Sequence, residues 1–397
     1  MSPSTENLQM KKKRSRRSRL AGALAMVVSV AAMTALTGCG QFFPPLSSTS
    51  GSGGSSGDYI YVGNLGTDPL TIAGFSIGSS ALSAISGSAW NSTYSPNSMV
   101  VTQNDDYLFM GTDSGEVFSF PIDSDGALGT GTVAGSLGPA AMVIDTSGDW
   151  LIGVDAFSGQ VYAFGLDSSS GTLTEPISSS IATMSGCNPS TDLAGGNPGL
   201  VIAPNDDYIY VSCGTAGIYT FSFDSTSGDL TSVNSTLNPK QSGDADFGLA
   251  MAPSGNYLFA AETGIGAVRV FSISSSNGTL SEVSGSPYKT ATGPNGVLVD
   301  STGTYVYVTN RTEGTISGFT ISSTGTLTAI TGSPFATGSL PQAMVEDSSD
   351  TYIAVACAGG DPDLEVYTIG TGGALTKFTT ATTGTDPTEA TSLAVTH

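Results

Sequence analysis

The sequence has few of the groups that carry out familiar acid–base or metal chemistry. Among its 397 residues is a single histidine, His397, which is the last residue. A Ser–His–Asp or Cys–His pair would require the chain end to fold back onto a nucleophile, and a zinc site of histidines and cysteines has too few ligands. Neither a GxGxxG segment at a strand–helix junction nor a phosphate-binding P-loop is present. We therefore expect no metal and no cofactor.

Basic residues are also scarce. The first 38 residues hold seven of the 12 basic residues and one of the 33 acidic ones, so the rest keeps five against 32, a net charge of −27. Nucleic acid, anionic lipid surfaces and phosphorylated substrates all need clustered Lys or Arg. We therefore expect no nucleic-acid partner. Such an acidic surface is typical of solubility outside the cell.

The N-terminus has the pattern of an export signal. A basic segment from Lys11 to Arg19 precedes an uncharged apolar stretch from Leu20 to Leu36. The segment Leu36-Thr37-Gly38-Cys39 then resembles a bacterial lipobox, in which the cysteine is lipidated and becomes the new N-terminus. A membrane-spanning helix is the alternative, but the apolar stretch is slightly short for one. Gly40 after the cysteine indicates an outer-membrane destination.

These features divide the chain into three parts. Residues 1–38 are interpreted as a lipoprotein signal peptide and residues 39–57 as a lipid-anchored linker. From Ser47 to Gly57 the linker is almost wholly Ser, Gly and Thr, which cannot bury a core. Residues 58–397 remain for the folded domain, which would be held at the periplasmic or surface side of the membrane through Cys39.

One strand pattern recurs seven times in the folded part, each time with an aromatic residue at its start. These aromatic anchors are Tyr59, Tyr107, Trp150, Tyr208, Tyr257, Tyr305 and Tyr352. Successive anchors are 43 to 58 residues apart, about the length of one four-stranded propeller blade. Beyond the N-terminal segment no 3.6-residue apolar period is sustained, so helix is not expected there.

One repeat shows how a blade would form. The apolar segments 297–299, 305–308, 315–321 and 327–330 are separated by turns rich in Gly, Ser, Asp and Asn. At the chain ends, Tyr59–Val62 lacks a preceding strand and 390–395 lacks a following one. Paired, the two ends complete one blade and remove the free sheet edges. We therefore predict an all-β, seven-bladed propeller with four-stranded antiparallel blades, closed by the N- and C-terminal strands.

The repeats also carry a family signature. Tyr307-Val308-Thr309-Asn310 spells the signature of the YVTN-repeat propellers, and Gly285-Ser286-Pro287-Tyr288 recurs as Gly332-Ser333-Pro334-Phe335. Over residues 58–397 the chain resembles the seven-bladed propeller lactonases, which include bacterial 6-phosphogluconolactonase-like proteins. This resemblance implies a lactone hydrolase, although the shared motifs consist mainly of turn and core residues.

The chain departs from the lactonase pattern at two places. Lactonase-type members commonly have Arg-His after a Gly-Pro, whereas Gly293-Pro294 is followed here by Asn295-Gly296. They often have Gly-His after the Asn-Arg of the loop, whereas Arg311 is followed here by Thr312-Glu313. Arg311 is therefore kept, while both neighbouring imidazoles are missing.

Candidate site residues lie where the second strand of each repeat ends, because these loops should share one face of the ring. The positions are Asn64, Asp113, Asp155, Cys213, Glu262, Asn310, Arg311 and Cys357. From them we select Asn310, Arg311, Glu262, Asp155 and Asp113 as candidate ligand-binding residues, with Arg311 and Glu262 as candidate catalytic residues. Two carboxylates across a cleft could act as acid and base on a sugar bond, and Arg311 could bind a substrate carboxylate.

Each of these candidates also has a structural interpretation. The acids could be solvated, and Arg311 could form a salt bridge to Glu313 or a neighbouring acid. Arg269 is expected to pack between blades and pair with Glu262. The Asp-, Ser- and Gly-rich segments such as 123–126 are explained by turns without calcium.

The remaining cysteines lie in an exported part of the chain, where a disulfide can form. Cys187 lies in the longest step between anchors and Cys213 ends the next repeated strand, so we pair them. Cys357 is then left over, as a small buried apolar residue.

Together these features predict a lipid-anchored propeller that serves as a binding or scaffold module in the cell envelope, with a small carbohydrate or a protein as ligand. The alternative is a lactonase-like or other carbohydrate-directed hydrolase with a site that lacks histidine.

Overall fold

The computed structural model describes residues 58–65, 70–155, 157–192, 198–237, 244–360, 362–383 and 390–397. All of them belong to the unit Gly38–His397. The signal peptide (1–38), the lipidation site Cys39 and the linker (39–57) lie outside the described residues, so those predictions stay predictions.

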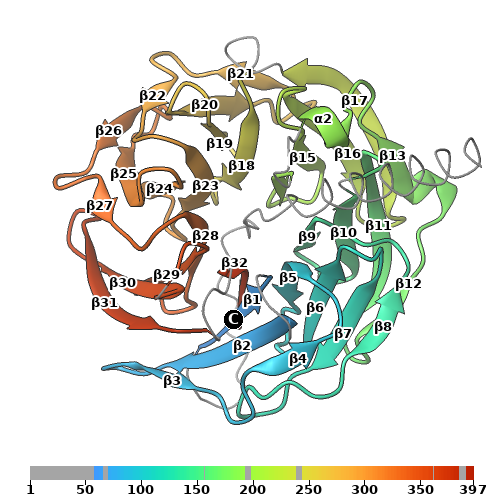
Figure 1. Cartoon of the computed structure of the whole chain (residues 1–397). Helices are drawn as coiled ribbons and strands as arrows, with labels where there is room; N and C mark the ends of the chain where they lie inside the picture. Colours follow the sequence, from blue (N-terminus) through green and yellow to red (C-terminus); the bar gives the residue numbers. More distant parts are fainter. Residues whose placement is uncertain are drawn as a thin grey trace, which may run out of the picture. The chain divides into compact units, whose positions relative to one another are not determined.

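Seven antiparallel sheets are arranged around a centre, with the first strand of each sheet toward the inside (Figure 1). Blade 1 contains β32 (Ala390–Val395), β1 (Tyr59–Asn64), β2 (Leu70–Ile77), β3 (Leu82–Ala84) and β4 (Trp90–Ser92). Blade 2 contains β5 (Pro96–Val101), β6 (Tyr107–Thr112), β7 (Val117–Pro121) and β8 (Thr132–Gly135). Blade 3 contains β9 (Ala141–Ile144), β10 (Trp150–Asp155), β11 (Gln160–Asp167), β12 (Thr172–Thr174) and β13 (Ile181–Thr183).

The other four blades follow the same order. Blade 4 contains β14 (Leu200–Ile202), β15 (Tyr208–Ser212), β16 (Ile218–Asp224) and β17 (Asp229–Leu237). Blade 5 contains β18 (Asp246–Met251), β19 (Tyr257–Glu262), β20 (Ala267–Ile273), β21 (Leu280–Glu282) and β22 (Tyr288–Lys289). Blade 6 contains β23 (Pro294–Val299), β24 (Tyr305–Asn310), β25 (Thr315–Ile321), β26 (Leu327–Ala329) and β27 (Phe335–Ala336). Blade 7 contains β28 (Pro341–Glu346), β29 (Tyr352–Cys357), β30 (Leu364–Ile369) and β31 (Leu375–Ala381).

The two chain ends close the ring as predicted. β32 pairs antiparallel with β1, and Ile60, Tyr61 and Val62 lie opposite Val395, Ala394 and Leu393. Every residue of β32 is buried. Closure by the termini gives blade 1 its inner strand and covers the edge of β1.

The aromatic anchors join neighbouring blades. Each of the seven begins the second strand of its blade, and six of them lie against a glycine in the outer turn of the next blade: Tyr59–Gly126, Tyr107–Gly171, Trp150–Gly228, Tyr208–Gly278, Tyr257–Gly325 and Tyr305–Gly373. All six glycines have positive φ, and a Cβ there would come within 2.6 Å of the ring. Glycine is thus required both by the turn and by the close approach of the ring.

Hydroxyl groups form a second set of links between blades, near the start of the first strands. Each donates a hydrogen bond to a backbone carbonyl of the following blade: Ser392 to Pro96, Ser98 to Pro139, Ser212 to Phe247, Thr263 to Pro294 and Thr309 to Gln342. Within the described ranges, five of the seven blade junctions are bridged in this way. No pattern in the repeat predicted these links.

Two details differ from the sequence-based prediction. In blades 1, 3, 5 and 6 the outer edge is two short segments that both pair with the third strand, because the chain leaves the sheet at a turn and returns to it. Helix is also present in the described part, as the four-residue α2 (Pro189–Asp192) and the 3₁₀ turn η2 (Ser178–Ser180). Neither of these short segments could cross a bilayer, and the described residues include no helix that could.

Candidate ligand-binding rim

The ends of the second strands lie on one face of the ring, together with the linkers that lead into the first strands. We call this set the rim; its residues are the strand ends Asn64, Thr112, Asp155, Glu262, Asn310 and Cys357, and Cys213 directly after β15. A backbone bridge between Gly214 and Asp246 shows the loop of blade 4 beside the linker into blade 5. The grouping of these loops is therefore as expected from the sequence, although the depth of each side chain differs.

Glu262 is fully buried and lies in a cluster of charges within blade 5. Arg269 Nε lies 3.8 Å from its Oε2 and 3.6 Å from Glu282 Oε1, and Arg269 Nη1 lies 3.6 Å from Asp246 Oδ2. The guanidinium also lies 4.7 Å from the centre of the Phe271 ring. The expected pairing of Arg269 with Glu262 is confirmed, with two further acids around the same cation.

Asp246 is the member of this cluster that the sequence analysis missed. The first strands of blades 2, 6 and 7 begin with Pro96, Pro294 and Pro341, whereas that of blade 5 begins with Asp246. This replacement of proline by an acid is the feature of the sequence that could have indicated a site here. Neither side-chain oxygen of Asp246 has a hydrogen bond among the described residues. Burial raises the pKa of Asp246 to about 8, although the charge of Arg269 acts in the opposite direction.

Asn310 is equally buried but lies in a neutral environment. Its Nδ2 donates hydrogen bonds to Thr315 Oγ1 and Ser317 Oγ, each 3.0 Å away. Its Oδ1 has no hydrogen-bond partner among the described residues. Asn310 therefore supports the loop between β24 and β25 from inside the blade.

Arg311 lies at the surface of the rim next to Asn310. Its backbone N–H donates to Gly293 O at 2.7 Å, and its side chain is half-buried. None of the ion pairs in the described part of the chain includes Arg311. The alternative of a salt bridge to Glu313 is not seen, and Glu313 Oε2 instead accepts a hydrogen bond from Thr292 N at 3.4 Å.

The other two candidate ligand residues are more accessible. Asp113 is exposed in the loop after β6. Asp155 is half-buried and caps its own loop, because its carboxylate accepts hydrogen bonds from Phe157 N and Ser158 Oγ, each at 2.7 Å. Phe157 follows it at the surface with 69% of its area exposed.

His397, the only imidazole, lies away from the rim. Its Nδ1 is 2.9 Å from Asp105 Oδ1, and its backbone N–H donates to the same oxygen. Asp105 belongs to the turn between β5 and β6, at the end of blade 2 opposite to the rim. The histidine thus fixes the chain end to blade 2.

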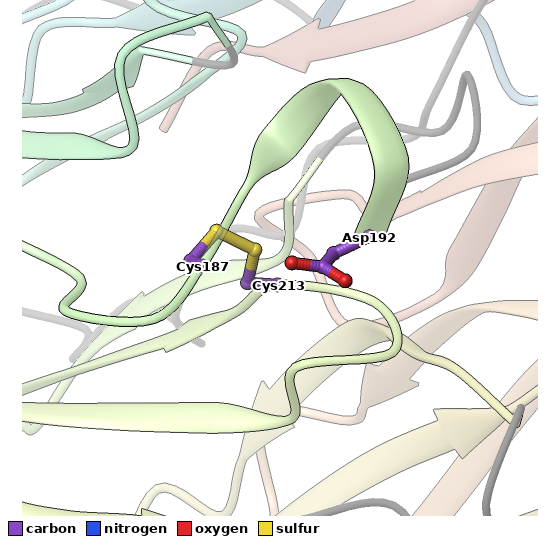
Figure 2. Close-up of side chains that lie close together, drawn as sticks. All are labelled: Cys187, Asp192 and Cys213. Carbon is purple, nitrogen blue, oxygen red and sulfur yellow. A yellow bond between two sulfur atoms is a disulfide. The ribbon is translucent and has the colours of Figure 1, made fainter.

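The disulfide between Cys187 and Cys213 is present, with the two Cα atoms 6.2 Å apart (Figure 2). It fixes the long linker before blade 4 to the end of β15. The Asp192 carboxylate lies beside the two sulfur atoms and accepts hydrogen bonds from Thr215 Oγ1 at 2.6 Å and Asn188 N at 2.7 Å. With the sulfur atoms joined to each other, neither offers the thiolate that a metal would need.

Cys357 is free and fully buried, as expected. Burial raises the pKa of its thiol to about 12. It is therefore a small apolar packing residue at the rim rather than a nucleophile.

Comparison with known proteins identifies the family of this chain. The family model described as a seven-bladed β-propeller lactonase matches residues 187–296 and 282–391, which together make up more than half of the chain. The chain belongs to the seven-bladed β-propeller lactonase family. No curated protein matches it.

Solved structures with the lactonase-type fold cover most of the chain. A periplasmic gluconolactonase of Pseudomonas aeruginosa is 15% identical with a TM-score of 0.69, covering 86% of this chain and 99% of its own. A candidate 6-phosphogluconolactonase of Bacteroides fragilis is 18% identical with a TM-score of 0.68, covering 88% of this chain and 100% of its own. A Lactobacillus plantarum protein is 18% identical with a TM-score of 0.70, covering 86% and 100%. At these identities the likeness is one of fold.

The two places where the chain departs from the lactonase motif lie against each other. Gly293 has a φ of +72°, and a Cβ on it would lie 2.2 Å from Thr312 Oγ1. The linker that carries the Gly293-Pro294 motif thus contacts the loop after Arg311 at one part of the rim. This part of the rim holds Asn295, Thr312 and Glu313 in place of imidazoles.

Proposed function

We propose that this protein is an exported, lipid-anchored propeller of the lactonase family that binds a small carboxylate-bearing carbohydrate at the rim of blade 6. The observation that carries the proposal is Arg311, which is half-buried at the rim, in no ion pair among the described residues, and beside a motif without histidine. A guanidinium binds a carboxylate through two parallel hydrogen bonds.

The overall charge of the protein opposes a carboxylate ligand at long range. A net charge of −27 beyond the signal repels anions at long range, so affinity must come from direct contact with Arg311. Asp113 and Asp155 share this face of the ring but belong to blades 2 and 3, across the ring from blade 6, so the proposed site does not include them (Figure 1).

Binding can be tested with purified protein and gluconate or glucuronate in a thermal-shift titration. We expect a saturable rise in Tm that Arg311→Ala abolishes. Lys289→Ala is the matched control because it removes an exposed cation on β22, an outer-edge strand of the neighbouring blade. If Arg311→Ala responds to either acid as the wild type does, the proposal fails.

Lactone hydrolysis is the second candidate, and the family match favours it. Arg311 would then stabilise the developing oxyanion, with a carboxylate in place of the missing imidazole as proton acceptor. The measurement is acid release from gluconolactone in a pH-stat. Turnover that disappears in Arg311→Ala but persists in Lys289→Ala would establish an enzyme and overturn the purely binding role.

The membrane anchor is tested separately. Cys39→Ala should move the protein from the membrane fraction to the soluble exported fraction, and incorporation of labelled palmitate should cease. Membrane retention of the variant would refute lipidation at Cys39.

A further inference from the structure

A groove with a volume of about 590 Å³ lies between blades 1 and 2. Its walls come from β4, from the linker 93–94, from β6 and β7, and from residues 128–131. In Figure 1, β4 of blade 1 lies beside β7 of blade 2, toward the outside of the ring. The groove is therefore separate from the rim of blade 6, and its volume falls in the usual range for small-ligand sites.

Four aromatic rings, together with Met110 and Leu128, make up most of the apolar part of the groove. Trp90, Tyr94, Phe118 and Phe120 all line it. The Tyr94 and Phe118 rings lie 5.6 Å apart, and Phe118 and Phe120 lie 6.4 Å apart. Ser92 Oγ donates to Tyr94 O at 2.6 Å and accepts from Tyr94 N at 3.3 Å, which fixes the backbone that carries the ring. The surface is thus pre-organised rather than assembled by a ligand.

The repeat itself does not require these aromatic residues. The linker position of Tyr94, two residues before the proline that starts the next first strand, holds Thr292 before blade 6 and Ser339 before blade 7. Phe118 pairs with Met110 of the second strand. The equivalent residues are Arg269 in blade 5, which pairs with Ala260, and Ser317 in blade 6, which pairs with Val308. The position of Phe118 is also aromatic in blades 3 and 4, where it holds Tyr162 and Tyr219. Tyr94 is therefore the ring that distinguishes this junction from those before blades 6 and 7.

The polar part of the groove carries no charge. No Asp, Glu, Lys, Arg or His is among its lining residues, in a protein that is otherwise strongly acidic. Asn91, Thr93 and Thr130 are exposed around it, and no hydrogen bond within the described part of the chain uses their side chains. Their amide and hydroxyl groups can both donate and accept hydrogen bonds.

We infer that this groove binds a neutral oligosaccharide, with sugar faces packed against Tyr94 and Trp90 and sugar hydroxyls bonded to Asn91, Thr93 and Thr130. Sugars combine apolar C–H faces with hydroxyls that donate and accept, which matches the two kinds of lining. A proline-rich peptide would use the aromatic rings, but it offers mainly carbonyl acceptors to the polar groups. The absence of charged lining residues selects against anions and cations alike.

The test uses the tryptophan in the groove as the reporter. The chain has two tryptophans, so Trp150→Phe leaves Trp90 as the only one. In that background, we expect cellotetraose, maltotetraose or N-acetylchitotriose to change the emission saturably. The affinity should stay constant between about 50 and 500 mM NaCl, because no charge pair is involved.

Substitutions separate the groove from the rest of the molecule. Tyr94→Thr, the residue found at the equivalent position 292, should weaken binding at least about tenfold without changing the circular dichroism spectrum. Asn91→Ala should weaken it less. Phe157→Ala removes an exposed aromatic ring outside the groove and should have no effect, and Arg311→Ala should leave sugar binding intact.

Three outcomes would overturn the inference. One is the absence of a saturable emission change with all three sugars. Another is unchanged affinity in a folded Tyr94→Thr variant. The third is binding of a proline decapeptide but of none of the sugars, which would assign the groove to a peptide. Failure of the Arg311 proposal would leave the groove unaffected, since the two sites use different blades and different variants.

Discussion

Blades 5 and 6 follow the same repeat and place side chains of opposite character at the same two positions. At the rim, blade 5 has Glu262 and blade 6 has Asn310. In the third strand, at the position that pairs with the middle of the second strand, blade 5 has Arg269 and blade 6 has Ser317. Blade 5 thereby buries several charges around one guanidinium, whereas blade 6 buries a neutral hydrogen-bonded group. The backbone of the repeat accepts either arrangement, so the chemistry between blades is set by each copy separately.

The two arrangements differ in what they cost. Removing charges from water is costly, and the attraction among them offsets that cost only while every partner remains. When one member of a neutral network is removed, the protein loses only the stability that the hydrogen bonds of that member contribute. The comparison therefore predicts unequal sensitivity to substitution.

The largest effect is expected from Arg269→Met, which keeps the apolar stem and removes the charge. It leaves the buried Glu262 without its cation, so the free energy of unfolding should fall by about 3–5 kcal/mol. Urea denaturation measures this value. Lys289→Met, which removes an exposed cation from the same blade, should change it by less than about 0.5 kcal/mol. A loss below about 1 kcal/mol in Arg269→Met would show that the cluster is not electrostatically coupled.

A smaller effect, dependent on pH, is expected from Asp246→Asn. Burial raises the folded-state pKa of Asp246 from 3.8 to about 8, so the folded state holds a proton that the unfolded chain has already released. The stability due to this group is complete below pH 4 and is lost as the pH rises toward 8. The variant should therefore melt higher than the wild type at pH 8, by about 3 °C or more, and by much less at pH 5.

The matched control for that prediction is Asp113→Asn, an exposed acid on the same face. Its effect on Tm should be small and the same at both pH values. A Tm difference for Asp246→Asn that does not change between pH 5 and pH 8 would contradict the raised pKa.

The smallest effect is expected in blade 6. Asn310→Ala removes hydrogen bonds to Thr315 and Ser317 and should cost about 1–2 kcal/mol. Ser317→Ala alone should cost less, and the double variant should cost less than the sum of the two. Strict additivity in denaturation experiments would show that the two side chains act independently, and the contrast with blade 5 would need another explanation.

Much of the fold could be predicted from the residues because its signals are local and repeated. The spacing of the aromatic anchors gave the number of blades, and the incomplete repeats at the two ends gave the closure. The pair Cys187–Cys213 followed from the position of the long linker. The pair Arg269–Glu262 followed from the place of Arg269 between blades, where other copies carry aromatic residues. The lactonase family followed from Tyr307-Val308-Thr309-Asn310 and the Gly-Ser-Pro turns.

The site was less accessible to prediction. Asp246 was missed because an acid at the start of an inner strand resembles a solvated loop residue until the neighbouring side chains are placed. Glu262 and Asn310 were selected correctly as rim positions, but their burial was not foreseen. The groove at Tyr94 was not seen at all, since its walls come from two blades and four separate segments.

By itself, the sequence determined the architecture of this protein, because strand period, turn residues and apolar alternation act within one repeat and add over seven copies. Only the tertiary structure decided which side chains meet water. Whether a residue at a strand end points into a blade junction or out of it depends on the volume and charge contributed by the next blade. That information is distributed over residues far apart in the chain, and packing alone brings them together.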